Sequence, residues 1–207
     1  GTDQELYSME DLIHAFDLSG IQKSGAIFNI EKLEWFNREY LKSYSHKEFT
    51  AYVESVTQSR FTALSQYSDT RFARLLPILR ERTTSSAQLN REVEAGEYDF
   101  VFEAPHPSAD MIKWKKDTDI RQTLSRLQKV AELVARIPED ADVEEVKSYI
   151  WDYATEVGKG EVLWPFRVAL TGRERSPDPF MVAHIIGSAE AYNRVKTACD
   201  TILKASS

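Results

Sequence analysis

The stretch that decides the fold is Glu161 to Phe180, EVLWPFRVALTGRERSPDPF. Its first half has apolar residues at helical spacing, which predicts a buried helix. Gly172 follows at the position where glycine commonly ends a helix. Asp178 and Pro179 then form an N-cap and a first helical position, because proline needs no amide partner there. The stretch therefore predicts two helices joined by a short turn.

The turn between these two helices carries cations. Arg173 and Arg175 lie in it, directly before the second helix. The N-terminus of a helix favours negative charge, so we expect an exposed site for a phosphate or a base edge. Arg167 is different, because it lies inside the apolar helix after Pro165. A half-buried arginine needs a partner, and spacing leaves open whether that partner is an internal carboxylate or a ligand.

The composition is that of a chain with a substantial core. It has 207 residues, of which 42% are hydrophobic, enough for one large domain or two small ones. No apolar run approaches the roughly 20 residues that span a membrane, and no N-terminal pattern indicates a signal peptide. The first residue is Gly1 rather than methionine, which suggests a fragment. The formal net charge of −7 argues against indiscriminate binding to nucleic acid but permits a local basic face.

The chain has a single cysteine, Cys199, so an internal disulfide is excluded. This cysteine usage fits a reducing compartment, and we expect a cytoplasmic protein. Cys199 lies among apolar residues at helical spacing and is predicted to be buried.

Helical periodicity extends over the rest of the chain. Ser8 predicts the start of a short helix that ends near Phe16, and Asn29 predicts the cap of a longer one. A turn is expected over 19–25. Because no alternating strand runs occur, the predicted class is all-α. Further helices are expected over 46–67 as two patterns, 69–82 with a kink at Pro77, 120–137, 143–157, 179–186 and 188–204, with 98–102 as a connector.

Catalytic constellations are missing from the sequence. The four histidines are scattered, and Gly158 to Gly160 does not match a phosphate loop. The acidic residues over 139–145 suit the start of a helix better than a metal site. We therefore predict no catalytic residue and no metal. What remains is the placement of cations: Arg80, Arg82, the lysines about Trp114, and the arginines of the opening stretch.

Three blocks of sequence resemble the C-terminal half of the bacterial-type glutamyl-tRNA synthetases. They are SGAIFNIEKLEWFNREYLK (24–42), LRERTTSSAQL (79–89) and LWPFRVALTGRERSPDPF (163–180). The last residues, HIIGSAEAYNRVKTACDTIL (184–203), are similar to the family's usual ending. The resemblance covers residues 5–204. It implies a helical cage that reads the anticodon, preceded over 1–45 by the tail of the stem-contact domain. Pro138 ends the long helix expected before it, so we place the boundary there, between two consecutive anticodon-binding subdomains, 46–138 and 139–207.

The resemblance also implies a function. The family ligates glutamate to tRNA(Glu) with ATP and Mg, but its catalytic signatures are absent here. We expect a tRNA(Glu)-binding fragment, inactive alone and without a cofactor of its own. It is expected to be a monomer that binds neither DNA nor membrane. Unstacked anticodon bases offer their edges and faces to arginine and aromatic side chains.

Site residues are carried over position by position. Arg82 matches an arginine that contacts the third anticodon base in several members, and it bears on whether tRNA(Gln) is accepted. The expected tRNA-binding residues are Lys32, Trp35, Arg82, Arg167, Arg173, Arg175, Ser176, Pro177 and Phe180. An all-helical protein-interaction module, whose arginines pair with acidic partners, is the alternative that the acidic balance and aromatic content leave open.

Overall fold

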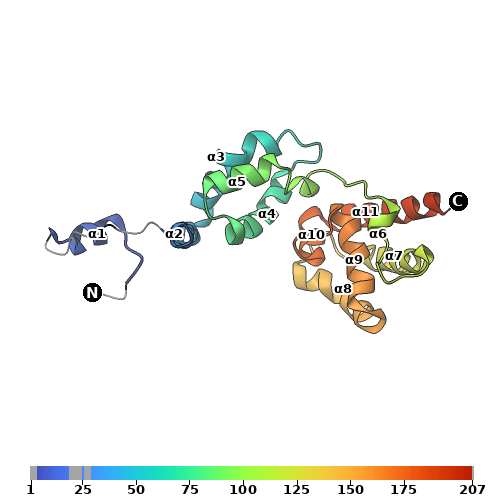
Figure 1. Cartoon of the computed structure of the whole chain (residues 1–207). Helices are drawn as coiled ribbons and strands as arrows, with labels where there is room; N and C mark the ends of the chain where they lie inside the picture. Colours follow the sequence, from blue (N-terminus) through green and yellow to red (C-terminus); the bar gives the residue numbers. More distant parts are fainter. Residues whose placement is uncertain (1–3, 19–24, 26–28, 207) are drawn as a thin grey trace.

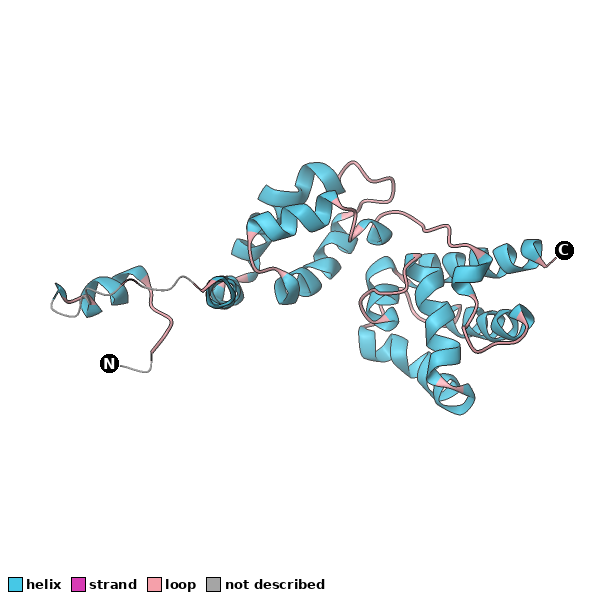
Figure 2. Ribbon diagram, in the orientation of Figure 1, coloured by secondary structure: helices cyan, strands magenta, loops and turns pink. Residues whose placement is uncertain are grey.

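A computed structural model describes residues 4–18, 25 and 29–206. Within these residues every regular element is a helix, which confirms the predicted all-α class (Figures 1 and 2). None of the described helices is long and apolar enough to cross a membrane. The elements are α1 (Met9–Ala15), α2 (Ile30–Ser43), α3 (His46–Phe61), α4 (Asp69–Arg82), α5 (Ser86–Glu94), η2 (Asp99–Val101, a 3-10 turn), α6 (Ala109–Ile112), α7 (Ile120–Val134), α8 (Val143–Val157), α9 (Lys159–Thr171), α10 (Pro179–Ile186) and α11 (Ser188–Ala205).

The predicted helix starts are confirmed by their caps. The Ser8 side chain accepts a hydrogen bond from the backbone N–H of Asp11, whose own side chain bonds back to complete a capping box. The Asn29 side chain likewise accepts from the N–H of Lys32. The turn expected over 19–25 lies outside the described residues except for Gly25.

Two segments differ from expectation. Residues 46–61 form the single helix α3 rather than two, because no glycine or proline interrupts them. The 98–102 segment does not cross over the core as a connector. Instead it forms η2, and Tyr98 and Phe102 are buried at 1% and 0% exposure. Its aromatic residues are therefore core residues.

Helix α9 ends as predicted at Gly172. This glycine has φ of +64°, a left-handed conformation that L side chains rarely adopt. A Cβ atom placed on it would lie 2.8 Å from Cβ of Pro105. Both the backbone and the neighbouring loop therefore require glycine here.

We predict that Gly172→Ala lowers the free energy of unfolding by about 1–2 kcal/mol from the left-handed backbone alone. The close contact with Pro105 adds to that cost. Urea denaturation followed by circular dichroism measures it. Gly25→Ala is the matched control, since a Cβ there meets nothing within 4 Å. Equal effects of the two substitutions would contradict the prediction.

The helices fall into two groups (Figure 1). Helices α2 to α5 lie together, a loop over 103–108 follows, and α6 to α11 form the second group. Helix α7 packs on α11 and α9, and so belongs to the second group. This packing differs from the predicted division at residue 138. We propose instead that the subdomain boundary lies in the 103–108 loop. The groups meet where α10 packs on α4 and η2.

One contiguous core runs through both groups, from Phe49 to Ile202. Helix α1 contributes nothing to it, since none of its residues is buried. Cys199 is buried as predicted, and burial raises the pKa of its thiol to about 11. This thiol is therefore a core group rather than a reactive one.

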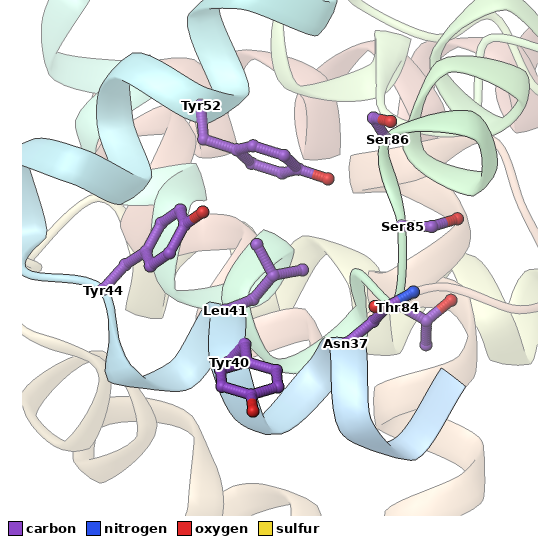
Figure 3. A pocket seen from close by; sticks show the side chains of 8 residues that line it. All are labelled: Asn37, Tyr40, Leu41, Tyr44, Tyr52, Thr84, Ser85 and Ser86. Carbon is purple, nitrogen blue, oxygen red and sulfur yellow. The ribbon is translucent and has the colours of Figure 1, made fainter. Parts of the chain in front are cut away.

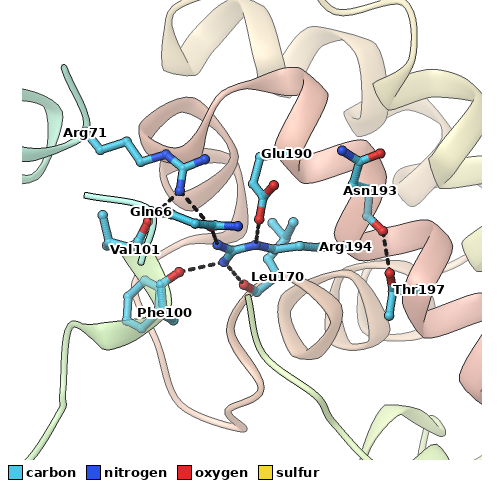
Figure 4. Close-up of polar contacts among 9 residues, drawn as sticks. All are labelled: Gln66, Arg71, Phe100, Val101, Leu170, Glu190, Asn193, Arg194 and Thr197. Carbon is cyan, nitrogen blue, oxygen red and sulfur yellow. Dashed lines mark hydrogen bonds and ion pairs between the residues drawn. The ribbon is translucent and has the colours of Figure 1, made fainter. Parts of the chain in front are cut away.

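Among the described residues, the buried arginine is Arg194 in α11, at 3% exposure (Figure 4). Its Nε donates to Glu190 at 2.7 Å, and its Nη1 donates to the carbonyl oxygens of Phe100 and Leu170. Burial lowers the pKa of Arg194, and the bond to Glu190 opposes that effect. Arg194 thus joins η2, α9 and α11 at the junction of the two groups.

Candidate nucleic-acid interface

Two neighbouring cavities meet at the C-terminal end of α4. Glu81 and Arg82, the last two residues of this helix, line both of them. We name them by the residue that distinguishes each. The Pro177 cavity, of about 270 Å³, is lined by Ile78, Glu81, Arg82, Pro177, Asp178 and Met181. The Arg38 cavity, of about 510 Å³, is lined by Arg38, Glu81, Arg82, Glu92, Glu97 and Tyr98.

The Pro177 cavity brings together two of the predicted site residues. Arg82 ends α4, and Pro177 precedes α10. They meet because α10 packs on α4. Ser176 is half-buried beside them, and its hydroxyl donates to the carbonyl oxygen of Pro177 at 2.8 Å. Arg82 and Pro177, which lie nearly a hundred positions apart in the sequence, thus line the same cavity.

The N-terminus of α10 is not the open anion site that the sequence suggested. Asp178 caps it, and its Oδ1 accepts the backbone N–H of Phe180 at 2.9 Å. This carboxylate supplies the negative charge that the helix end favours. The helix end therefore does not attract a phosphate.

Phe180 is buried at 2% exposure. Its ring packs on Trp151 at 6.3 Å and on Phe166 at 6.5 Å between centroids. The side chain has no surface to offer a base, so the structure corrects its assignment as a contact residue. Its role is to fix α10 against the core.

Arg173 is held within the protein. Its Nη1 lies 2.7 Å from Oε2 of Glu97, and its Nη2 donates to the carbonyl oxygen of Gly96 at 2.7 Å. Because Glu97 lines the Arg38 cavity, Arg173 ties the loop before α10 to that cavity. Arg175 is exposed nearby and makes no hydrogen bond or ion pair with any described residue.

Arg80 also has a structural role. Its guanidinium donates to the carbonyl oxygens of Tyr44 and Ser45 and lies 4.4 Å from the centroid of the Phe49 ring. These contacts tie the end of α2 to α3 and α4. Of the two arginines at the end of α4, Arg82 is the one that faces the cavities.

Arg167 lies apart from both cavities. It is half-buried in α9, and none of the described carboxylates pairs with it. Its Nε is buried without a hydrogen-bond partner. Arg167 is thus not held by a described carboxylate. It also does not line the Arg38 cavity or the Pro177 cavity.

Lys32 and Trp35 share one side of α2. The Lys32 ammonium pairs with Glu5 at 2.6 Å. The Trp35 ring contacts Phe36 edge-on at 5.1 Å between centroids and remains 37% exposed. Both are accessible to a ligand that lies along α2.

Comparison with known proteins decides the family. The model of the anticodon binding domain family matches residues 31–199. The chain belongs to this family.

Curated relatives extend the match. The glutamate–tRNA ligase of Clostridium tetani is 31% identical over 98% of this chain, and that of Flavobacterium johnsoniae is 28% identical over 98%. The chain spans only 40% and 38% of their respective lengths. A crystal structure of a glutamate tRNA ligase from Elizabethkingia meningosepticum, in complex with its amino acid, superposes with a TM-score of 0.75 at 26% identity. That match covers 96% of this chain and 38% of the other.

This anticodon-binding domain has further cavity residues that sequence reasoning missed. Tyr98 was assigned to a connector, yet it lines the Arg38 cavity, and its hydroxyl donates to Glu92 at 2.7 Å. Burial raises its pKa, Glu92 adds to the effect and Arg82 opposes it, so the phenol stays neutral. Arg38 was not among the expected tRNA-binding residues. Its spacing three residues before the buried Leu41 was the available signal.

A third cavity of the anticodon-binding domain lies between α2, α3 and the start of α5 (Figure 3). It has about 250 Å³ and is lined by three tyrosines and a run of hydroxyl residues. Tyr44 and Tyr52 meet edge to face at 6.2 Å between centroids. The lining residues are Asn37, Tyr40, Leu41, Tyr44, Tyr52, Thr84, Ser85 and Ser86.

Metal chemistry finds no support among the described residues of the anticodon-binding domain. No group of three or more His, Cys, Asp or Glu side chains could hold a metal ion there. The acidic residues near the start of α8 include Asp142, whose side chain accepts from the N–H of Glu145 as an N-cap. That carboxylate caps the N-terminus of α8 and complements its dipole.

Proposed function

We propose that the chain is the tRNA(Glu)-binding, anticodon-recognising part of a glutamate–tRNA ligase. The observation that carries the proposal is the position of Arg82 on the shared edge of two cavities, within an anticodon-binding domain. A guanidinium can donate two parallel hydrogen bonds to a base edge. Pro177 and Met181 give the same cavity apolar surface for the base to lie against.

The overall charge of the chain suits selective rather than general binding. The net charge of −7 makes the chain as a whole repel a polyanion such as a nucleic acid. Cations that lack an internal ion pair, such as Arg82, Arg167 and Arg175, offer local attraction. A splayed anticodon loop can reach such points, whereas a regular duplex hides its base edges.

The parent protein is proposed to ligate glutamate to tRNA(Glu) with ATP and Mg. The described residues offer neither a metal site nor a phosphate loop. ATP and Mg would therefore bind in the part of the ligase that this chain does not cover. We expect the chain to be inactive alone. We further propose a cytoplasmic monomer that binds neither DNA nor membranes.

Titration of the chain with tRNA(Glu) transcripts tests the proposal. We expect binding that weakens when anticodon bases are substituted and that weakens less when bases in the elbow are substituted. Fluorescence anisotropy at one fixed salt concentration gives the affinities. Indifference to every anticodon substitution would exclude base reading. A chain that recovers proteins in a pull-down but leaves tRNA unbound would favour the protein-interaction alternative.

A further inference from the structure

The Arg38 cavity contains a second arginine that no assignment accounts for. Arg38 lies on α2, whose buried residue Leu41 is three positions further along the same face. That face packs against α4. Since residues three apart lie on one side of a helix, Arg38 is directed toward the end of α4, where Arg82 lies.

The side chain of Arg38 has no partner in the described part of the protein. Its Nε is buried and lacks a hydrogen bond, although three carboxylates line the same cavity. Buried polar groups are normally hydrogen-bonded, and leaving one unpaired destabilises a fold. An unpaired guanidinium beside an open cavity is accordingly explained by a ligand that the cavity receives.

The charged side chains that line the Arg38 cavity indicate which kind of ligand fits it. Two guanidiniums face three carboxylates, those of Glu81, Glu92 and Glu97. Glu92 already accepts from Gln88 and Tyr98, and Glu97 pairs with Arg173. An anionic phosphate would meet these carboxylates, whereas an uncharged group with both donors and acceptors would satisfy the arginines and Glu81 together. The edge of a nucleobase is such a group.

The size of the cavity agrees with this chemistry. At about 510 Å³ it lies within the range of roughly 300–1,000 Å³ that is typical of ligand pockets. Tyr98, a neutral phenol at 1% exposure, forms part of its wall.

We propose that Arg38 is a second base-reading arginine, which shares with Arg82 the recognition of one anticodon base in the Arg38 cavity. This inference rests on the proposed anticodon-binding function. Arg38 and Arg82 line the same cavity from two different helices, so their substitution affects discrimination at the same anticodon position.

Two substitutions separate base reading from phosphate contact. Arg38→Lys keeps the charge but loses the planar fork, and Arg38→Gln removes the charge. The full chain is titrated with tRNA(Glu) transcripts that differ at each anticodon position, at several salt concentrations. Arg121→Gln is the matched control, because Arg121 is exposed on α7 and lines neither cavity.

We expect both Arg38 variants to lose about 5- to 150-fold of discrimination at the position that Arg82→Ala also affects. The dependence of affinity on salt should stay unchanged, since no phosphate contact is lost. Thermal melting verifies that each variant is folded, and Arg38→Lys alone carries the test if Arg38→Gln does not fold.

Other outcomes overturn the inference in distinguishable ways. Discrimination that survives both substitutions, in a wild-type chain that does discriminate, removes Arg38 from base reading and leaves the proposed function intact. Weaker binding of all transcripts by Arg38→Gln, with a shallower salt dependence and rescue by lysine, identifies a phosphate contact instead. A wild-type chain without any anticodon preference overturns the proposed function together with this inference.

Discussion

Arg194→Met should lower the free energy of unfolding by about 3–5 kcal/mol, the usual cost of removing one member of a buried ion pair. The substitution keeps most of the side-chain volume. It leaves the Glu190 carboxylate without its partner and removes the donors to the carbonyl oxygens of Phe100 and Leu170. Desolvated groups without hydrogen bonds account for most of the loss. Urea denaturation followed by circular dichroism gives the value.

Arg121→Met is the control for this experiment, since its guanidinium is exposed and makes no bond to a described residue. It should change stability by less than about 0.5 kcal/mol. A loss below about 1 kcal/mol for Arg194→Met would show that the contacts in Figure 4 do not hold the two helix groups together.

Arg82→Ala should reduce discrimination at one anticodon position by about 1–3 kcal/mol. The reason is that Arg82 lines both cavities, is exposed and forms no ion pair with a described residue, so its guanidinium can reach a base edge. Affinities for wild-type and substituted tRNA(Glu) transcripts, measured with both proteins at one salt concentration, give the change.

Lys32→Ala supplies the contrast. As a compact charge on the exposed side of α2, Lys32 should contribute a phosphate contact. Its removal is expected to weaken all transcripts alike and to reduce the slope of log affinity against log salt by about 1. If Arg82→Ala behaves in this same uniform way, Arg82 contacts the backbone rather than a base.

Local signals in the sequence predicted most of the fold. Ser8, Asn29 and Asp178 as caps, and Gly172 as a stop, act through bonds to residues within a few positions. Their effects could therefore be read from short stretches. The predicted subdomain boundary at residue 138 does not match the packing of the helices. Pro138 is a local signal for the end of a helix, whereas the group to which α7 belongs depends on its distant contact with α11.

The site was harder to predict, because its members come from distant parts of the chain. Arg82 and Pro177, which line one cavity, were both named from a resemblance rather than from spacing. The half-buried position predicted for Arg167 is confirmed, but the burial of Arg194 was not predicted. The available signal was a Glu190–Arg194 pair four residues apart on an otherwise apolar stripe of α11.

Chemical probing of the anticodon loop tests the central claim most directly. Reagents that modify the Watson–Crick edges of unpaired bases are applied to tRNA(Glu), alone and saturated with the chain. If Arg82 and its two cavities read the anticodon, at least one anticodon base becomes protected in the complex, and Arg82→Ala restores its reactivity. Unchanged reactivity of all three anticodon bases in a saturated complex would contradict the account.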